Sequence, residues 1–158
     1  MVDPLVERAR SALTDAYAPY SSYRVGAALR TADGTVVVGC NIEIANYSNS
    51  IHAEEAAIAE AVTTGHTEIA KLAVTSAARD GVTPCEMCRQ TLAEFCDESF
   101  PIVCDRGDDT DEYTLGELLP EAISQETLEA ASEDTHEEVS EDTLEEASEE
   151  ASEDGGSK

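Results

Sequence analysis

The feature that most limits the possible folds is a predicted β-hairpin followed by alternating helix and strand patterns. Residues 25–31 and 35–40 are apolar or β-branched runs on either side of an Ala-Asp-Gly turn, which is a strong hairpin signal. Apolar spacing and turn residues then predict the remaining elements: helices over 4–17, 53–64 and 87–96, strands over 69–76 and 101–105, and a strand end with one helical turn over 113–119. This order predicts a three-layer α/β/α domain.

The C-terminal segment, residues 124–158, has a different character. Glu-Asp-Thr recurs in it, with glutamate pairs and small residues between, and its only large apolar residues are Leu128, Val139 and Leu144. These are too few to bury a core. We therefore expect a folded domain over 1–123 and a disordered, acidic low-complexity tail over 124–158.

The charge of the chain limits its partners. There are 35 acidic residues against 9 lysines and arginines, a net charge of −26, and the part before Glu121 alone carries −12. A nucleic-acid polymer is excluded as a partner, because binding to phosphates requires a basic surface. Molar salt shortens the screening length to about 3 Å and so relieves the self-repulsion of such a surface. This acid-rich, lysine-poor composition resembles proteins of salt-accumulating microbes; a mesophilic acidic protein is the alternative.

Apolar runs and cysteines indicate the compartment. No run is long enough to span a membrane, and the N-terminus lacks a basic segment followed by an apolar stretch. The five cysteines include one C-x-x-C, which favours metal or redox chemistry in a reducing compartment over disulfides. We expect a soluble, cytoplasmic protein with no membrane partner.

Two short motifs carry the chemistry. His52-Ala53-Glu54 is H-x-E, and Cys85 and Cys88 follow in a P-C-x-x-C, a combination typical of zinc deaminases. A catalytic zinc takes three protein ligands and one water. Cys85 and Cys88 can face one metal at the first turn of a helix, whose positive end favours thiolates, and His52 supplies the third ligand. Glu54 is then free to carry a proton from the zinc-bound water to the substrate.

Each motif alone has a simpler interpretation. A C-x-x-C can be a redox pair or half of a structural zinc site, with His66 or Cys104 nominally available as a further ligand. Both motifs occur here in order, with His52 and Cys85 separated by 33 positions that hold a predicted helix and strand. This combination favours a catalytic metal.

Further motifs make the family recognisable. Residues 5–123 resemble the small, homotetrameric type of cytidine deaminase. The matching stretches are Ala18-Pro19-Tyr20-Ser21, Val25-Gly26-Ala27-Ala28-Leu29, Gly39-Cys40-Asn41-Ile42-Glu43, His52-Ala53-Glu54, Pro84-Cys85, Cys88-Arg89-Gln90 and Glu117-Leu118-Leu119-Pro120.

The resemblance implies a fold and an activity. It implies a five-stranded mixed sheet, a homotetramer with one Zn²⁺ per subunit, and hydrolytic deamination of cytidine and deoxycytidine with release of ammonia in pyrimidine salvage. It also implies that Asn41 and Glu43 hold the ribose hydroxyls, that Tyr23 packs near the pyrimidine, and that Ala53 belongs to the substrate-binding set.

The sequence departs from the family pattern at four positions. His52 stands where many small tetrameric members have cysteine, and Glu55 stands where such members have arginine. Because one histidine and two thiolates neutralise Zn²⁺, the arginine is not needed, so the two changes are consistent. Ile44 stands where the family often has asparagine. Ile123 stands where the family often has a phenylalanine that reaches a neighbouring subunit. Both replacements bear on the substrate preference.

Several alternatives stay open at this stage. The substrate could be a modified cytosine nucleoside, such as an antibiotic nucleoside, or the chain could be an interaction module stabilised by structural zinc. Arg89 could hydrogen-bond a thiolate or support an interface. Cys40, Cys96 and Cys104 are expected to be small buried hydrophobes.

Overall fold

The computed structural model describes residues 2–138, and its chain contacts divide into two units, Met1–Ala122 and Ile123–Lys158. The metal motifs and the predicted strands all lie in the first unit.

A single five-stranded sheet forms the middle layer of the first unit, in the order β2-β1-β3-β4-β5. The strands are β1 (Val25–Thr31), β2 (Val36–Cys40), β3 (Ile69–Ser76), β4 (Pro101–Asp105) and β5 (Thr110–Thr114). β3 and β4 are parallel, whereas the other neighbouring pairs of this sheet are antiparallel. The predicted five-stranded mixed sheet is therefore confirmed.

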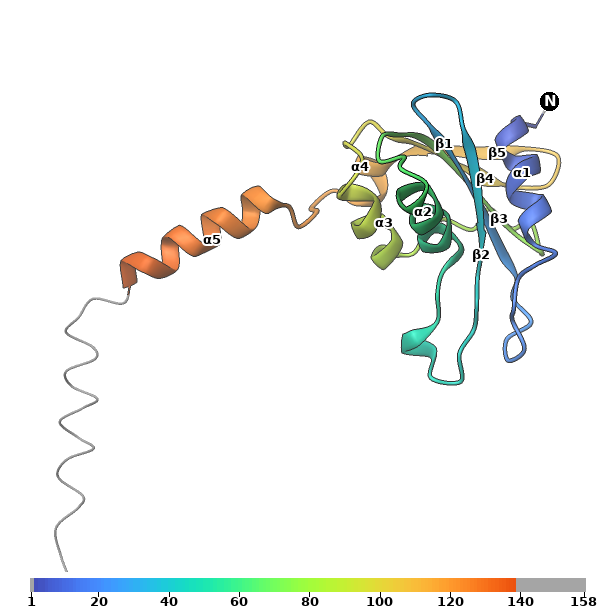
Figure 1. The fold of residues 1–158 in the computed structure, drawn as a ribbon, viewed down its shortest axis with the longest axis horizontal. Helices are drawn as coiled ribbons and strands as arrows, with labels where there is room; N and C mark the ends of the chain where they lie inside the picture. Colours follow the sequence, from blue (N-terminus) through green and yellow to red (C-terminus); the bar gives the residue numbers. More distant parts are fainter. Residues whose placement is uncertain (1, 139–158) are drawn as a thin grey trace, which may run out of the picture. The chain divides into compact units, whose positions relative to one another are not determined.

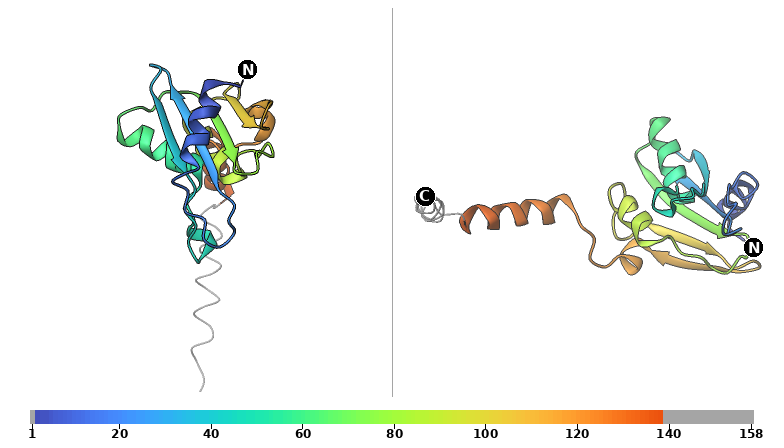
Figure 2. Two further views of the ribbon diagram at one scale, coloured as in Figure 1. Left: turned by 90° about the vertical axis from the view of Figure 1, so that its right-hand side faces the viewer. Right: turned by 90° about the horizontal axis from the view of Figure 1, so that it is seen from below.

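Helices cover both faces of this sheet (Figures 1 and 2). α1 (Pro4–Ala12) packs on one face, and its apolar side chains form a small core with Ala28, Ala73 and Val103. α2 (Ala53–Thr63), α3 (Glu86–Ala93) and the single turn α4 (Leu115–Leu118) contribute to a larger core on the opposite face. A short 3₁₀ helix, η1 (Tyr47–Asn49), precedes α2. The three-layer α/β/α fold is confirmed.

Two glycines let helices approach the sheet on opposite faces. A Cβ at Gly26 of β1 would lie 2.2 Å from the carbonyl oxygen of Ala9 on α1. A Cβ at Gly39 of β2 would lie 2.3 Å from the carbonyl oxygen of Ala53 and 2.4 Å from the nitrogen of Ala57, both on α2. Any side chain at either position would push a helix away from the sheet.

Most predicted elements agree with the structure within a few residues, but the first helix was predicted too long. α1 ends at Ala12, whereas apolar spacing favoured 4–17. The chain after Ala12 forms turns with i→i−3 hydrogen bonds, and Tyr17 then pairs with the 41–43 segment, donating its N–H to Asn41. This strand-like contact between distant segments overrides the helical periodicity.

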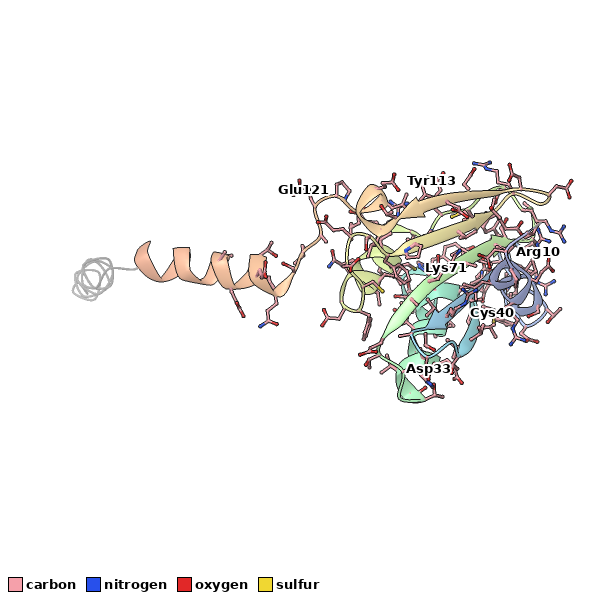
Figure 3. The ribbon with its side chains drawn as sticks, turned by 90° about the horizontal axis from the view of Figure 1, so that it is seen from above. Arg10, Asp33, Cys40, Lys71, Tyr113 and Glu121 are labelled. Carbon is pink, nitrogen blue, oxygen red and sulfur yellow. The ribbon has the colours of Figure 1, made fainter. Side chains whose placement is uncertain are left out.

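Few cations are available, and two of them link α1 to the sheet. Arg10 on α1 contacts the fully buried Asp105 at the end of β4, at 2.6 and 2.7 Å, and Lys71 on β3 donates to Asp3 at 2.7 Å. Figure 3 labels Arg10 and Lys71. All five cysteines, each within the described residues, are free thiols. Among residues 2–138, the structure has no helix long and apolar enough to cross a membrane.

The described part of the second unit contains α5 (Gln125–Glu138). This helix lies in the segment predicted to be a disordered tail. Residues 139–158, which include Val139 and Leu144, lie outside the described residues, so the disorder of the tail stays a prediction.

Candidate active site

His52, Cys85 and Cys88 meet in one cluster. The Nδ1 atom of His52 lies 3.1 Å from the Sγ of Cys85 and 3.2 Å from the Sγ of Cys88, and the two sulfur atoms are 3.4 Å apart. A tetrahedral Zn²⁺ with Zn–S near 2.3 Å and Zn–N near 2.0–2.1 Å separates its ligand atoms by about 3.5–3.8 Å. The donor set therefore fits zinc, with ligand atoms that sit slightly closer than a bound ion would hold them.

Two helix starts bring these ligands together. His52 is the N-cap residue of α2, and Cys85 is the N-cap residue of α3. The positive ends of both helices therefore point toward the cluster and favour its thiolate forms. Glu55, which departs from the family pattern together with His52, accepts the backbone N–H of His52 at 3.2 Å. Its carboxylate thus helps to fix the histidine backbone at the start of α2.

Glu54 lies behind the cluster and is almost fully buried. Its side chain is 4% exposed, and its Oε2 lies 3.6 Å from the Sγ of Cys88. Burial raises the pKa of the Glu54 carboxyl, and burial together with Glu54 raises the pKa of the Cys88 thiol. A divalent cation acts in the opposite direction, because it stabilises both anions. Without a cation both groups favour their protonated forms, so their burial side by side suits a metal ion that stabilises the anions.

A cavity of about 410 Å³ opens directly onto this cluster. This volume suits a ligand the size of a nucleoside. The predicted site residues that line it are Tyr23, Asn41, Glu43, His52, Ala53, Glu54 and Cys85. Cys88, the remaining predicted site residue, is fully buried against Glu54. One cavity therefore brings together residues from four separate chain segments.

Glu43 is held by the loop between α1 and β1. Its carboxylate accepts the backbone N–H groups of Tyr20 at 2.9 Å and Ser21 at 3.2 Å, and it also accepts the hydroxyl of Ser21. The Ser21 hydroxyl is the main cause that lowers the pKa of Glu43, so the side chain is an anionic acceptor at neutral pH. A ribose hydroxyl at this wall would meet an acceptor with a fixed orientation.

Asn41 has contacts that the sequence did not predict. Its Oδ1 accepts the N–H of Val25 and its Nδ2 donates to the carbonyl of Tyr23, both at 2.9 Å. Asn41 therefore lines the cavity while it also ties the start of β1 to the end of β2.

The structure gives the contacts of three residues whose roles the motifs left open. The three guanidinium nitrogen atoms of Arg89 donate to the carbonyls of Pro84 and Leu118 and to the hydroxyl of Thr83. These acceptors are oxygen atoms and not thiolates. It thus fastens the turn that precedes Cys85. His66 contacts Thr64 and Asp33, and Cys104 is buried in β4. In the part of the chain that the structure describes, His52, Cys85 and Cys88 form a metal-binding group without a fourth member.

Sequence reasoning missed part of the cavity wall. Ser21, Thr83, Tyr47 and Ile51 also line it, and Tyr47 is 62% exposed and Ile51 43% exposed. Ser21 lies in a stretch that carried the family resemblance, which was the available signal. Tyr47 and Ile51 reach the cavity through the loop that contains η1, whose path no periodicity predicts.

Comparisons with known proteins agree with this geometry. The family model for the cytidine and deoxycytidylate deaminase zinc-binding region matches residues 3–104. A cytidine deaminase of Sporosarcina psychrophila is 42% identical over 128 residues, covering 80% of this chain and 94% of that protein. A cytidine deaminase of Halalkalibacterium halodurans is 38% identical over 125 residues, covering 78% and 95%.

Solved structures show the same fold. The crystal structure of cytidine deaminase from Burkholderia pseudomallei aligns with a TM-score of 0.73 at 38% identity, over 78% of this chain and all of that one. The cytidine deaminase of Mycobacterium tuberculosis aligns with a TM-score of 0.68 at 35% identity, over 78% of this chain and 99% of that one.

Proposed function

Because the chain belongs to the cytidine and deoxycytidylate deaminase family, we propose that it deaminates cytidine and deoxycytidine to uridine and deoxyuridine, with release of ammonia in pyrimidine salvage. One observation carries this proposal. A metal-binding trio and a buried carboxylate meet at the end of a cavity of nucleoside size.

In this proposal His52, Cys85 and Cys88 hold one Zn²⁺ per subunit. A histidine and two thiolates match the charge of the ion and its preference for nitrogen and sulfur. When bound, the ion supplies a water of lowered pKa at the inner end of the cavity.

Glu54 then moves the protons. Its buried carboxylate lies 3.6 Å from Cys88 and lines the cavity, so it can reach both the water and a base placed beside the cluster. It takes one proton from the attacking water and delivers it to the ring nitrogen of the cytosine as the water oxygen bonds to the amidine carbon. It then takes the second proton from the hydroxyl formed on that carbon and delivers it to the amine, so that the carbonyl forms as the carbon–nitrogen bond breaks and ammonia departs. Its burial excludes competing water from this path.

The cavity residues outside the metal-binding cluster are assigned to the sugar and the base. Glu43, already oriented by Ser21, accepts a ribose hydroxyl, and Asn41 stands beside it. The ring of Tyr23 and the backbone of Ala53 form the surfaces along which the pyrimidine lies. A nucleoside without a phosphate suits this wall, because its charged members are acidic.

A modified cytosine nucleoside remains the second candidate substrate. Tyr47 and Ile51 line the cavity and are exposed, so the wall that they form leaves room for a substituent on the sugar or base. The structural-zinc alternative is disfavoured, because three ligands rather than four converge within residues 2–138 and an acid lies behind them.

The homotetramer is also part of the proposal. Tyr47 and Ile51 line the cavity and are exposed, and the exposed ring of Tyr20 lies against that of Tyr47, with 6.1 Å between the ring centroids. A patch of this kind favours contact with another subunit. Molar mass by light scattering in molar and in low salt tests it, and a monomer under both conditions contradicts it. The cytoplasmic location and the salt-accumulating host stay predictions.

The decisive experiment follows the ultraviolet absorbance of cytidine in molar potassium chloride, with Glu54→Gln as the matched variant. We expect loss of the cytidine band with release of ammonia, and a kcat about 10²–10⁴-fold lower in Glu54→Gln at equal zinc content. A zinc-loaded, folded protein that leaves cytidine unchanged would direct the search to modified cytosine nucleosides.

A further inference from the structure

Asp80 joins two walls of the cavity. Its carboxylate oxygens lie 3.0 and 3.2 Å from the hydroxyl of Tyr23, on the loop before β1. Asp80 itself lies in the loop between β3 and α3, two residues before Val82, and Val82 and Thr83 line the cavity. The same loop continues into Cys85, so this hydrogen bond connects the tyrosine wall with the segment that carries a metal ligand.

Each partner of this contact is held from its own side. Asp80 accepts the hydroxyl of Ser76, at the end of β3, at 2.7 Å, and its carbonyl accepts from Arg106 at 3.1 Å. The Ser76 hydroxyl is the main cause that lowers the pKa of Asp80, so Asp80 is the anionic acceptor. Burial raises the pKa of Tyr23, so its hydroxyl keeps the proton that it donates.

The backbone of Tyr23 is fixed as well. Its N–H donates to the Ser21 hydroxyl at 2.9 Å, and its carbonyl accepts from Asn41 at 2.9 Å. The tyrosine is thus fastened at the backbone by residues of the sugar wall and at the hydroxyl by Asp80. Its ring cannot swing away from the cavity while both attachments hold.

We propose that Asp80 is a positioning residue that holds the Tyr23 ring at a fixed distance from the metal-binding loop and thereby sets the affinity for the substrate base. The inference rests on the proposed function, because it takes the cavity as the nucleoside site. Asp80 acts through Tyr23 and touches none of the reacting atoms. Its effect therefore falls on substrate binding and not on the chemical step.

The test compares Tyr23→Phe, Asp80→Ala and the double variant in zinc-loaded protein. A hydrogen bond to a charged group contributes only a modest free energy when it lies at an exposed position. We accordingly expect KM for cytidine to rise about three- to tenfold in each single variant, with kcat changed less than about twofold. The double variant should be no worse than the poorer single variant, because one interaction is removed in all three.

Two further variants separate positioning from a general structural or charge effect. Asp80→Asn keeps an acceptor oxygen and should retain most of the affinity. Asp108→Ala removes an exposed carboxylate on the turn between β4 and β5 and should leave KM unchanged. Zinc content and melting temperature are measured for every variant.

The outcomes separate the two proposals. An active wild type whose KM is unaffected by Tyr23→Phe and Asp80→Ala overturns the role of Asp80 alone, as do additive effects in the double variant. A wild type inactive on all cytosine nucleosides overturns the proposed function instead.

Discussion

The two faces of the sheet use the beginnings of their helices differently. On one face, Asp3 is the N-cap residue of α1, and its carboxylate accepts the N–H of Leu5 and also binds Lys71. On the other face, His52 and Cys85 are the N-cap residues of α2 and α3, and their side chains lie 3.1 Å apart. The N-cap side chain on the α1 face is bonded within the protein, whereas the opposite face directs the starts of two helices at the metal-binding cluster of His52, Cys85 and Cys88.

This comparison separates stability from chemistry. The α1 face has its polar groups paired with one another, as Arg10 with Asp105 and Lys71 with Asp3. On the α2–α3 face, no lysine or arginine among residues 2–138 pairs with the buried carboxylate of Glu54 or with the thiols of Cys85 and Cys88. Changes on the first face should therefore alter the free energy of unfolding, and changes on the second should alter turnover.

The largest expected effect on stability comes from Arg10→Ala. The substitution leaves Asp105 buried without its cation, which typically costs about 3–5 kcal/mol. We expect that loss in the free energy of unfolding, measured with urea at high salt, and an unchanged kcat per folded molecule. The double variant Arg10→Met/Asp105→Asn should recover part of this loss, because it also removes the buried charge of Asp105.

The same pair has a predictable pH dependence. Burial alone would raise the pKa of Asp105, but Arg10 and the hydroxyl of Thr75 outweigh it and keep the pKa below its ordinary value of 3.8. A lowered carboxyl pKa stabilises the fold fully above that ordinary value, and the contribution is lost as pH falls through the folded pKa. The difference in the free energy of unfolding between the wild type and Arg10→Ala should therefore shrink as pH falls through the folded pKa of Asp105, and a difference that stays constant from neutral to acid pH would contradict this assignment.

The two glycines provide a matched pair of intermediate effect. Gly26→Ala and Gly39→Ala each place a Cβ against helix backbone, on the α1 face and the α2 face respectively. Overpacking of this kind costs about 1–3 kcal/mol. Both variants should lose similar stability, but only Gly39→Ala should lose zinc affinity and turnover, because α2 carries His52 and Glu54. Equal losses of turnover in the two variants would show that the faces are not independent.

A smaller effect is expected from His52→Cys. A third thiolate adds one negative charge to the cluster, and Glu55 stands where a compensating cation would be required. We expect kcat to fall about tenfold, the effect of about 1.4 kcal/mol on the barrier. Full turnover of the zinc-loaded variant would refute the charge argument, whereas recovery by Glu55→Arg in the same chain would support it.

The smallest effect concerns Lys71→Ala. Lys71 and Asp3 are both about one-fifth exposed, and such an ion pair contributes about 0–1 kcal/mol. Burial opposes the shift, but Lys71 and the N–H of Leu5 lower the pKa of Asp3. We expect a small loss in the free energy of unfolding that shrinks further in molar salt, measured by urea unfolding at two salt concentrations. A loss that persists in molar salt would instead indicate packing by the lysine stem.

Much of the fold could be predicted because its signals are local. The strands β1, β3 and β4 begin and end where β-branched and apolar runs do. His52, Glu54, Cys85 and Cys88 were found for the same reason, since metal ligands near helix starts have fixed spacing. The structure brings these four residues together, and their roles in catalysis are the subject of the proposed experiment.

The parts of the fold and of the site that the sequence did not predict depend on contacts between distant segments. α1 ends early because Tyr17 pairs with the 41–43 segment, and Asn41 holds backbone groups of Tyr23 and Val25. The contact between Tyr23 and Asp80 joins residues 57 positions apart, so no spacing rule could indicate it. Such contacts can be recognised only once the sheet has placed the loops beside one another.

The close approach of α2 to Gly39 has a consequence for how the protein loses its metal. Because the first turn of α2 carries both His52 and Glu54 and packs against backbone without an intervening side chain, it cannot shift without opening the cluster. Release of the ion should therefore be gated by local unfolding of this turn. The rate at which a chelator removes zinc then measures that opening event, and it reports the rigidity of the site without any substrate.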